Sequence, residues 1–213
     1  MKAIFLYLTI ILLFLLACNK EEDEPRTPVL AGVFNSSMNY KEWNPAFQVT
    51  LQHDGMRNMD YGKDSLDINQ DGSYDVIISQ NNLRFNSSAN NNSIDIFPFY
   101  YLSLKNGLSI AVIKEPNFTV INQLSNAYWV DTIAYKTNLE NITNWSDSYS
   151  NNLSYATPPT VFFGYDGPWY GLSNKEAYIA MRIHTSSRYR YGWIKVNVTS
   201  PEKVSIISYA LEK

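Results

Sequence analysis

A short acidic segment contains the oxygen-bearing side chains best placed for metal chemistry. It has the pattern D-x-N-x-D-G-x-x-D, and the predicted ligands are Asp67, Asn69, Asp71, Ser73 and Asp75. Gly72 lets the backbone turn sharply, so oxygens at alternate positions can converge on one cation. Calcium takes roughly six to eight oxygen ligands. We therefore expect Ca²⁺ here, held by the Asp and Asn side chains and the carbonyl of Ser73, with water completing the shell.

The flanking sequence distinguishes this segment from an EF-hand. An EF-hand has a carboxylate at the last loop position, where this chain has Ile78, and a helix afterwards, where residues 76–79 have strand character. The pattern instead resembles calcium loops that connect strands in extracellular β proteins, where the ion is structural. Mg²⁺ suits such loops poorly because it demands octahedral geometry. The alternative is a metal-free turn, since Asp, Asn and Gly favour turns by themselves.

Three aromatic residues have the properties of a sugar-binding platform. Trp145, Trp169 and Tyr170 can offer flat apolar faces to a sugar ring, with Asn and Asp side chains nearby for its hydroxyls. The alternative is that these rings close one end of the core, because Trp and Tyr bury large apolar areas. The sequence leaves both interpretations open.

Candidates for acid–base catalysis are few. His184 and Arg182 alternate onto one predicted strand face, where Asp166 or Glu176 could join them, but a solvated polar face explains the pattern as well. Glycoside hydrolysis needs a pair of carboxylates. Spacing marks none of those available: Asp131, Glu140, Asp147 and Asp166. The chain also has no P-loop, nucleophile elbow, dinucleotide-binding or zinc-protease motif.

The N-terminus predicts export and lipidation. Lys2 precedes an apolar run over residues 3–16, which is shorter than the roughly 20 residues of a membrane-spanning helix and fits a signal peptide. The run ends in Leu15-Leu16-Ala17-Cys18, which resembles the lipobox of bacterial lipoproteins. That resemblance implies cleavage before Cys18, lipidation of its thiol and membrane attachment through acyl chains. An ordinary secretory signal is the alternative.

The residues after Cys18 predict where the lipoprotein is sorted. Asn19 is not the Asp that retains many lipoproteins at the inner membrane, and residues 20–24 resemble the acidic export signal of surface lipoproteins in the Bacteroidota. A solvated tether is the alternative, and Pro25 and Pro28 stiffen it. We expect an outer-membrane lipoprotein exposed at the cell surface. Its predicted parts are a signal peptide at 1–17, an acidic tether at 18–28 and one domain at 29–213.

Composition excludes several classes of protein. The chain has a formal net charge of −3 and only 17% charged residues, which argues against a nucleic-acid partner. Its single Cys excludes a disulfide scaffold. Aromatic residues make up 15% of the chain, too many for a disordered protein. The composition is that of a folded domain whose polar character comes from amides and hydroxyls.

Strand patterns predict the fold. No stretch keeps helical spacing for three turns, whereas strand signals recur at 46–52, 75–79, 94–104, 108–113, 118–121, 128–135, 160–163, 178–184, 188–199 and 204–211. Residues 105–107 predict a hairpin turn, and residues 139–157 a long loop or a short helix. We expect an all-β fold: an antiparallel two-layer β-sandwich, jelly-roll-like, with at most one short helix.

The C-terminal strands show the clearest alternation. Ile179, Met181 and Ile183 share one predicted face of their strand. In the next strand Ile194, Val196 and Val198 are predicted to face inward, opposite Tyr191, Trp193 and Lys195. The last three strands should therefore form an antiparallel meander over a buried core.

These strands also carry a resemblance to a group of proteins. The segments are Tyr178-Ile179-Ala180-Met181-Arg182-Ile183, Tyr191-Gly192-Trp193-Ile194-Lys195-Val196 and Tyr209-Ala210-Leu211-Glu212. With the earlier calcium-type loop, they resemble secreted β proteins and lipoproteins of the Bacteroidota. Ala180 and Ile183 depart from that pattern, which has Gly and Phe. The group has no assigned activity, so the resemblance implies a fold and a location only.

Together these features predict a lipid-anchored β-sandwich with a structural calcium loop, acting as a binding or structural module. A glycan or a surface protein is the expected partner. The alternative is a surface carbohydrate-active enzyme whose catalytic carboxylates the sequence does not identify. The missing catalytic motifs favour the binding module.

Overall fold

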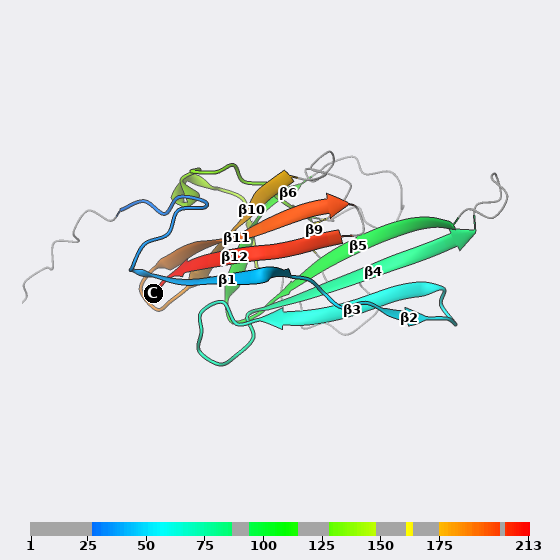
Figure 1. Cartoon of the computed structure of the whole chain (residues 1–213). Coiled ribbons are helices and arrows are strands. Elements are labelled where there is room, and N and C mark those ends of the chain that lie inside the picture. The colour runs from blue at the N-terminus through cyan, green and yellow to red at the C-terminus, as the bar shows by residue number, and fades with distance from the viewer. Residues whose placement is uncertain (1–26, 87–93, 115–127, 148–160, 164–174, 201–202) are drawn as a thin grey trace, which may run out of the picture.

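The observed fold is all-β. The structure is a computed structural model that describes residues 27–86, 94–114, 128–147, 161–163, 175–200 and 203–213. Within these ranges the strands are β1 (Met38–Phe47), β2 (Gln52–Asp54), β3 (Met59–Leu66), β4 (Val76–Asn86), β5 (Ile94–Leu104), β6 (Leu108–Lys114), β7 (Tyr128–Val130), β8 (Trp145–Ser146), β9 (Val161–Phe163), β10 (Lys175–His184), β11 (Tyr189–Ser200) and β12 (Lys203–Glu212). One 3₁₀ helix, η1 (Leu139–Asn141), accompanies them (Figure 1).

The strands form two layers (Figure 1). One has the order β1-β12-β11-β10-β6, and the other has the order β9-β5-β4-β3-β2. Strand β6 links them, because residues 108–110 pair with β10 and residues 112–114 pair with β7. Strand β7 then runs parallel to β9, and every other pair is antiparallel. The predicted antiparallel two-layer β-sandwich is confirmed.

The main core fills the space between the layers. Its residues from β10 and β11 include Ala177 and all six that the alternation predicts: Ile179, Met181, Ile183, Ile194, Val196 and Val198. The opposite layer contributes buried side chains from β3, β4 and β5: Leu66, Val76, Ile78, Leu102 and Leu104. The period of two is clear in these strands because successive side chains of a strand point to opposite faces.

A second, smaller core covers the outer face of the β10–β11 layer. Trp193 is buried there, and small residues make room for it: Ala111, Ala180 and Ala210. The segments that contain Ala31 and Thr137 cover these residues. They are bonded to each other, since Ala31 donates its N–H to the carbonyl of Thr137 at 2.9 Å. The indole of Trp193 donates to the carbonyl of Val33 at 3.0 Å. The predicted outward side of β11 is therefore partly buried in the middle of the strand and open at both ends.

The predicted hairpin at residues 105–107 was wrong. Residues 105–107 do turn sharply, with positive φ at Asn106 and Gly107, but they do not form a hairpin. Strand β5 pairs with β4 and β9, whereas β6 pairs with β10, β7 and β8. The turn therefore carries the chain from one layer to the other, because turn residues fix a reversal but not the pairing of strands.

The predicted strand at 46–52 is also wrong. Strand β1 ends at Phe47, residues 48–51 are not in a strand, and β2 begins at Gln52. Val49 still packs against the core, which explains the apolar alternation without a ladder. Similarly, only 128–130 of the predicted 128–135 are in a strand.

Of the remaining predicted elements, some are present in the structure and one lies outside the described residues. The C-terminal meander is confirmed as β10, β11 and β12, and η1 supplies a short helix within 139–157. The predicted strand at 118–121 lies outside the described residues. In the part of the chain that the structure describes, no helix has the length and apolar character needed to cross a membrane.

Candidate functional site

The acidic loop connects β3 to β4 at one end of the sandwich. Gln70 and Gly72 both have positive φ, at 62° and 89°, and these two residues reverse the chain. Carboxylate groups inside the loop then accept backbone N–H groups. The carboxylate of Asp67 accepts from Asp71 and Gly72 at 3.2 and 2.9 Å.

Asp71 is bonded within the same loop. Its carboxylate accepts the N–H of Ser73 at 2.7 Å and the side-chain amide of Asn69 at 2.9 Å. The Ser73 N–H and then the Asn69 amide hold the pKa of this carboxyl below its ordinary value. The carboxylate is therefore charged at neutral pH.

Asp75 is the buried anchor of the loop, with 0% of its surface exposed. One carboxylate oxygen accepts the N–H groups of Ile68 and Asn69 at 2.9 and 3.0 Å. The other accepts the amide of Asn106 at 3.1 Å, and Asn106 lies in the turn between the two layers. The start of the loop and the turn between the layers are thus both fastened to one carboxylate.

The loop also contacts the opposite layer. The Tyr209 hydroxyl of β12 donates to the carbonyl of Asp67 at 2.9 Å. Asn39 of β1 donates its amide to the carbonyl of Asn69 at 3.0 Å. A group that rigidifies the loop would therefore also fasten the two layers together.

The predicted calcium ligands are close in sequence, but their arrangement is not that of a preformed metal centre. No group of three acidic, His or Cys side chains among the described residues has metal-site spacing. The Asn69 amide nitrogen lies 2.9 Å from an Asp71 oxygen and 3.4 Å from an Asp75 oxygen, so an N–H donor stands between them. The donor set would be all oxygen if Asn69 turned its carbonyl inward, and the oxygens of Asp67 and Asp71 each accept one hydrogen bond and keep a second lone pair. Both oxygens of Asp75 already accept two, so Asp75 would have to release a donor to bind the ion.

Trp145 lies in an aromatic cluster on the outer face of β10 and β11. The Arg182 guanidinium carbon lies 4.6 Å from the Trp145 ring centroid and 4.1 Å from that of Tyr189. Tyr191 and His184 flank this stack, with ring centroids 5.9 Å from Trp145 and 4.9 Å from Tyr189. Trp145 is half-buried, and its indole N–H donates to the carbonyl of Ile142 at 2.7 Å. Trp169, Tyr170 and Cys18 lie outside the described residues.

The proposed partners of Arg182 and His184 are not brought to them. Glu176 instead pairs with Lys195, with 2.7 Å between carboxylate oxygen and ammonium nitrogen. Asp166 lies outside the described residues. Sequence reasoning missed the tyrosines of this cluster, although the register Arg182–Tyr191 and His184–Tyr189 follows from the hairpin that the sequence predicts.

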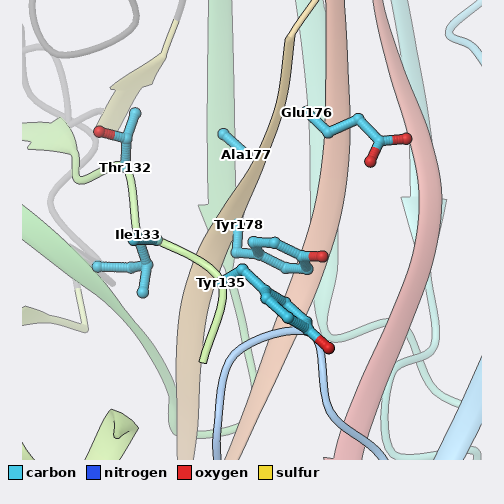
Figure 2. Close-up of a pocket in the computed structure, with 7 residues that line it drawn as sticks. Thr132, Ile133, Tyr135, Glu176, Ala177 and Tyr178 are labelled. Atoms are coloured by element: carbon cyan, nitrogen blue, oxygen red, sulfur yellow. The ribbon is translucent and has the colours of Figure 1, made fainter. Parts of the chain in front are cut away.

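A groove of about 520 Å³ opens at the other end of β10 (Figure 2). Its lining includes Tyr135 and Tyr178, whose ring centroids are 6.2 Å apart with planes inclined by 33°. Glu176 and Thr132 complete its polar part. Gly32 packs against both rings, and a Cβ at this position would lie 2.6 Å from each.

The charges beside this groove are paired. Burial opposes ionisation of Lys195, but the hydrogen bond and charge of Glu176 outweigh it, so the pKa of Lys195 is raised. Burial raises the pKa of the Tyr178 hydroxyl, which therefore stays a hydrogen-bond donor at neutral pH. The groove thus offers aromatic faces, a carboxylate acceptor and hydroxyl donors together.

A second groove, of about 620 Å³, lies on the β2–β3–β4–β5 layer. Its lining is mainly hydroxyl, amide and amine side chains: Thr50, Gln52, Tyr61, Lys63, Ser79, Asn81 and Ser103. Tyr61 is its one aromatic side chain among the described lining residues. It therefore lacks the paired rings of the first groove.

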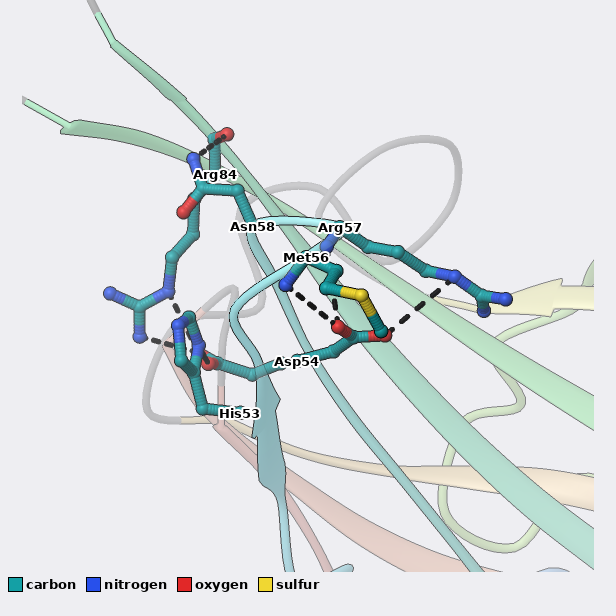
Figure 3. A network of polar contacts seen from close by, with 7 residues as sticks. His53, Asp54, Met56, Arg57, Asn58 and Arg84 are labelled. Atoms are coloured by element: carbon teal, nitrogen blue, oxygen red, sulfur yellow. Dashed lines mark hydrogen bonds and ion pairs between the residues drawn. The ribbon is translucent and has the colours of Figure 1, made fainter.

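A polar network that sequence reasoning missed closes the far end of β2 and β3 (Figure 3). Asp60 accepts from His53 at 2.7 Å and from the Nε of Arg84 at 3.0 Å, and the Nη2 of Arg84 also bonds the same carboxylate. The Arg84 hydrogen bond holds the pKa of Asp60 below its ordinary value. Asp54 caps the adjoining turn by accepting from Met56 at 3.0 Å.

The chain matches no protein-family model, no curated protein and no solved structure with which it was compared. The resemblance to secreted β proteins of the Bacteroidota therefore stays a prediction. The candidate sites are defined by residues and geometry alone.

Proposed function

We propose that this protein is a lipid-anchored, surface-exposed β-sandwich that binds a glycan in the groove lined by Tyr135 and Tyr178. The observation that carries the proposal is the groove itself, which is lined by two neighbouring tyrosine rings and by Glu176 (Figure 2). Sugar rings present apolar C–H faces that pack on aromatic rings, and hydroxyls that need hydrogen-bond partners. Tyr135, with 58% of its surface exposed, is the more accessible ring, although the Lys136 ammonium lies 5.4 Å from its centroid and would have to move aside for a sugar.

An array of neutral oligosaccharides probed with the full-length protein in detergent tests this function. We expect at least one oligosaccharide to bind, and Tyr135→Ala to weaken it by about tenfold, the value of one aromatic contact. Tyr61→Ala is the matched control, because Tyr61 is an exposed tyrosine in the other groove. Absence of binding, or equal effects of both variants, would contradict the proposal.

Attachment through Cys18 gives the module its location. The lipobox-like sequence before Cys18 and the acidic residues 20–24 support acylation and surface display. Metabolic labelling with a fatty acid should mark the wild-type protein and leave Cys18→Ser unmarked. Protease added to intact cells should then remove the wild-type domain. A labelled but protease-resistant protein would place it on the periplasmic face.

Calcium would act in the loop as a structural ion. Asp67, Asn69, Asp71 and Asp75 would hold it through side chains and Ser73 through its carbonyl, and the ion's charge would relieve the repulsion between carboxylates. Calorimetric titration should give heat that Asp71→Ala abolishes. No heat at millimolar calcium would leave the loop as a turn stabilised by its own hydrogen bonds.

A surface carbohydrate-active enzyme is the alternative, and one observation favours it. Burial raises the pKa of Asp131, which directly precedes the groove residue Thr132. A raised pKa is what a general acid of a glycosidase requires. Turnover of a bound oligosaccharide that Asp131→Asn abolishes would establish the enzyme. Binding without turnover would establish the binding module.

A further inference from the structure

Arg182 is a half-buried cation for which no hydrogen-bond acceptor is found among the described residues. Its Nε is buried without a hydrogen bond, and none of the carboxylates in the described residues forms an ion pair with it. Buried charged groups are normally paired, because an unpaired one loses its hydration without compensation. The other two half-buried arginines in the described residues both have acceptors: Arg84 bonds Asp60 through two nitrogens, and Arg190 donates its Nε to the carbonyl of Glu212 at 2.7 Å. Arg182 therefore has an unfilled requirement for an acceptor.

The guanidinium of Arg182 is held in place although no described residue accepts a hydrogen bond from its N–H groups. Trp145 and Tyr189 stand 4.6 and 4.1 Å from its guanidinium carbon and hold the cation between two rings. A guanidinium held in this way presents its N–H groups in fixed directions, which suits the two oxygens of a carboxylate or sulfate. Preorganisation also lowers the entropy lost on binding.

We propose that the stack of Trp145, Arg182 and Tyr189 binds the oxyanion of an acidic saccharide. The Nη groups of Arg182 supply the charge-assisted hydrogen bonds, because its buried Nε lies out of reach of a ligand, and the partly exposed ring of Tyr189 supplies a surface for the sugar ring. Arg188, in the turn after β10, adds positive charge to the approach. This site lies at the opposite end of β10 from the Tyr135–Tyr178 groove, so binding here does not depend on glycan binding in that groove.

Matched oligosaccharides test the site in full-length protein held in detergent. The probes are hexagalacturonic acid, its fully methyl-esterified form, a sulfated galactan oligosaccharide with its desulfated form, and poly-glutamate. We expect one acidic saccharide to bind and its neutral form to bind at least tenfold more weakly. The carboxylate and sulfate arms identify which oxyanion fits. Equal binding of charged and neutral forms would overturn the proposal, as would absence of binding by both acidic saccharides.

Variants separate recognition by Arg182 from general attraction. Arg182→Gln should weaken the acidic probe by about ten- to a hundredfold, and Arg182→Lys should rescue little of this, because a point charge lacks the planar fork. Arg188→Gln is the charge-matched control and should leave affinity within about threefold at 0.15 M salt. Circular dichroism checks folding of each variant. Equal losses for Arg182→Gln and Arg188→Gln, or tighter binding of poly-glutamate than of either saccharide, would overturn the assignment.

The groove provides an independent comparison. Tyr135→Ala should leave the acidic probe's affinity unchanged, whereas it weakens neutral glycans under the proposed function. Failure of the groove would therefore appear in the neutral array, and failure of the Arg182 site would appear in the acidic pairs. If Tyr135→Ala weakened the binding of both the acidic probe and the neutral glycans, the two ligands would share one site, and the proposal of a separate Arg182 site would be overturned.

Discussion

The acidic loop and the Arg182 stack differ in whether their charged groups have hydrogen-bond partners within the described chain. Every carboxylate of Asp67, Asp71 and Asp75 accepts hydrogen bonds from the loop or its neighbours. Arg182 is held by aromatic rings alone, and its buried Nε has no acceptor among the described residues. The loop carboxylates hold their own backbone in place before any ion binds, whereas the Arg182 guanidinium has no acceptor among the described residues and can bond a ligand. The first region should therefore respond in stability and the second in binding.

The largest expected loss of stability is that of Asp75→Ala. This change removes a fully buried acceptor and leaves the N–H groups of Ile68 and Asn69 without a partner. Buried donors left in this way cost about 1–3 kcal/mol each, so we expect about 3 kcal/mol in the free energy of unfolding by urea. Asp71→Ala is the matched control, because Asp71 is exposed in the same loop. Equal losses for the two variants would show that burial of Asp75 is not what matters.

Calcium should produce the next largest effect, which is an increase in the stability of the folded domain. An ion that binds only the folded protein stabilises it by about 2.7 kcal/mol at a hundred times its dissociation constant. Because the loop bonds Tyr209 and Asn39 of the opposite layer, the whole domain should melt at a higher temperature. Differential scanning calorimetry with calcium and with a chelator measures this shift. Magnesium is the control ion, and an equal shift with it would indicate a general charge effect.

Asp60→Asn should cost less, about 1.5 kcal/mol in the free energy of unfolding. Asp60 bonds both Arg84 and His53, and its side chain is only 13% exposed, but Asn keeps one acceptor oxygen. The folded pKa of Asp60 is lowered, so its contribution is present above the unfolded pKa of about 3.9 and is lost as pH falls through the folded value. The wild-type and variant stabilities should therefore converge in acid.

Asp54→Asn is the control for this network. Asp54 caps the neighbouring turn, and Asn makes the same turn bond, so its unfolding free energy should stay within about 0.5 kcal/mol of wild type. A difference between Asp60→Asn and wild type that persists unchanged at low pH would show that the loss has another cause than the Asp60 charge.

The sequence predicts the C-terminal layer well because the larger aliphatic residues alternate along its strands, although the second core buries part of the outer face as well. Ile179 and Ile194 repeat on the core side of strands long enough to show a period of two. Residues 48–51 show the same alternation without a strand, because Val49 packs on the core from an irregular segment. Apolar alternation therefore reports burial and indicates a strand only when neighbouring chain can pair with it.

The sites are predicted less completely, because they depend on contacts between distant segments. The acidic loop is local, and its pattern alone marks it. Trp145 meets Arg182 only because β8 pairs with β6 and β6 with β10. The Tyr135–Tyr178 groove likewise forms where an irregular segment bridges to β10 through Ile133. The spacing of residues in a single sequence predicts neither the pairing of β8 with β6 nor the bridge from Ile133 to β10.

The smallest expected effect on stability is that of Arg182→Gln, and it completes the comparison with Asp75. Two cation–π contacts are lost, each worth roughly 0.5–1 kcal/mol at a partly exposed site. Against this, the variant removes a buried N–H that has no acceptor, and relief of that desolvation offsets much of the loss. The free energy of unfolding should therefore change by about 0.5 kcal/mol or less, although the same variant abolishes most binding of the acidic saccharide. A loss as large as that of Asp75→Ala would make Arg182 a structural residue, because a group whose removal unfolds the domain cannot be one whose bonds await a ligand.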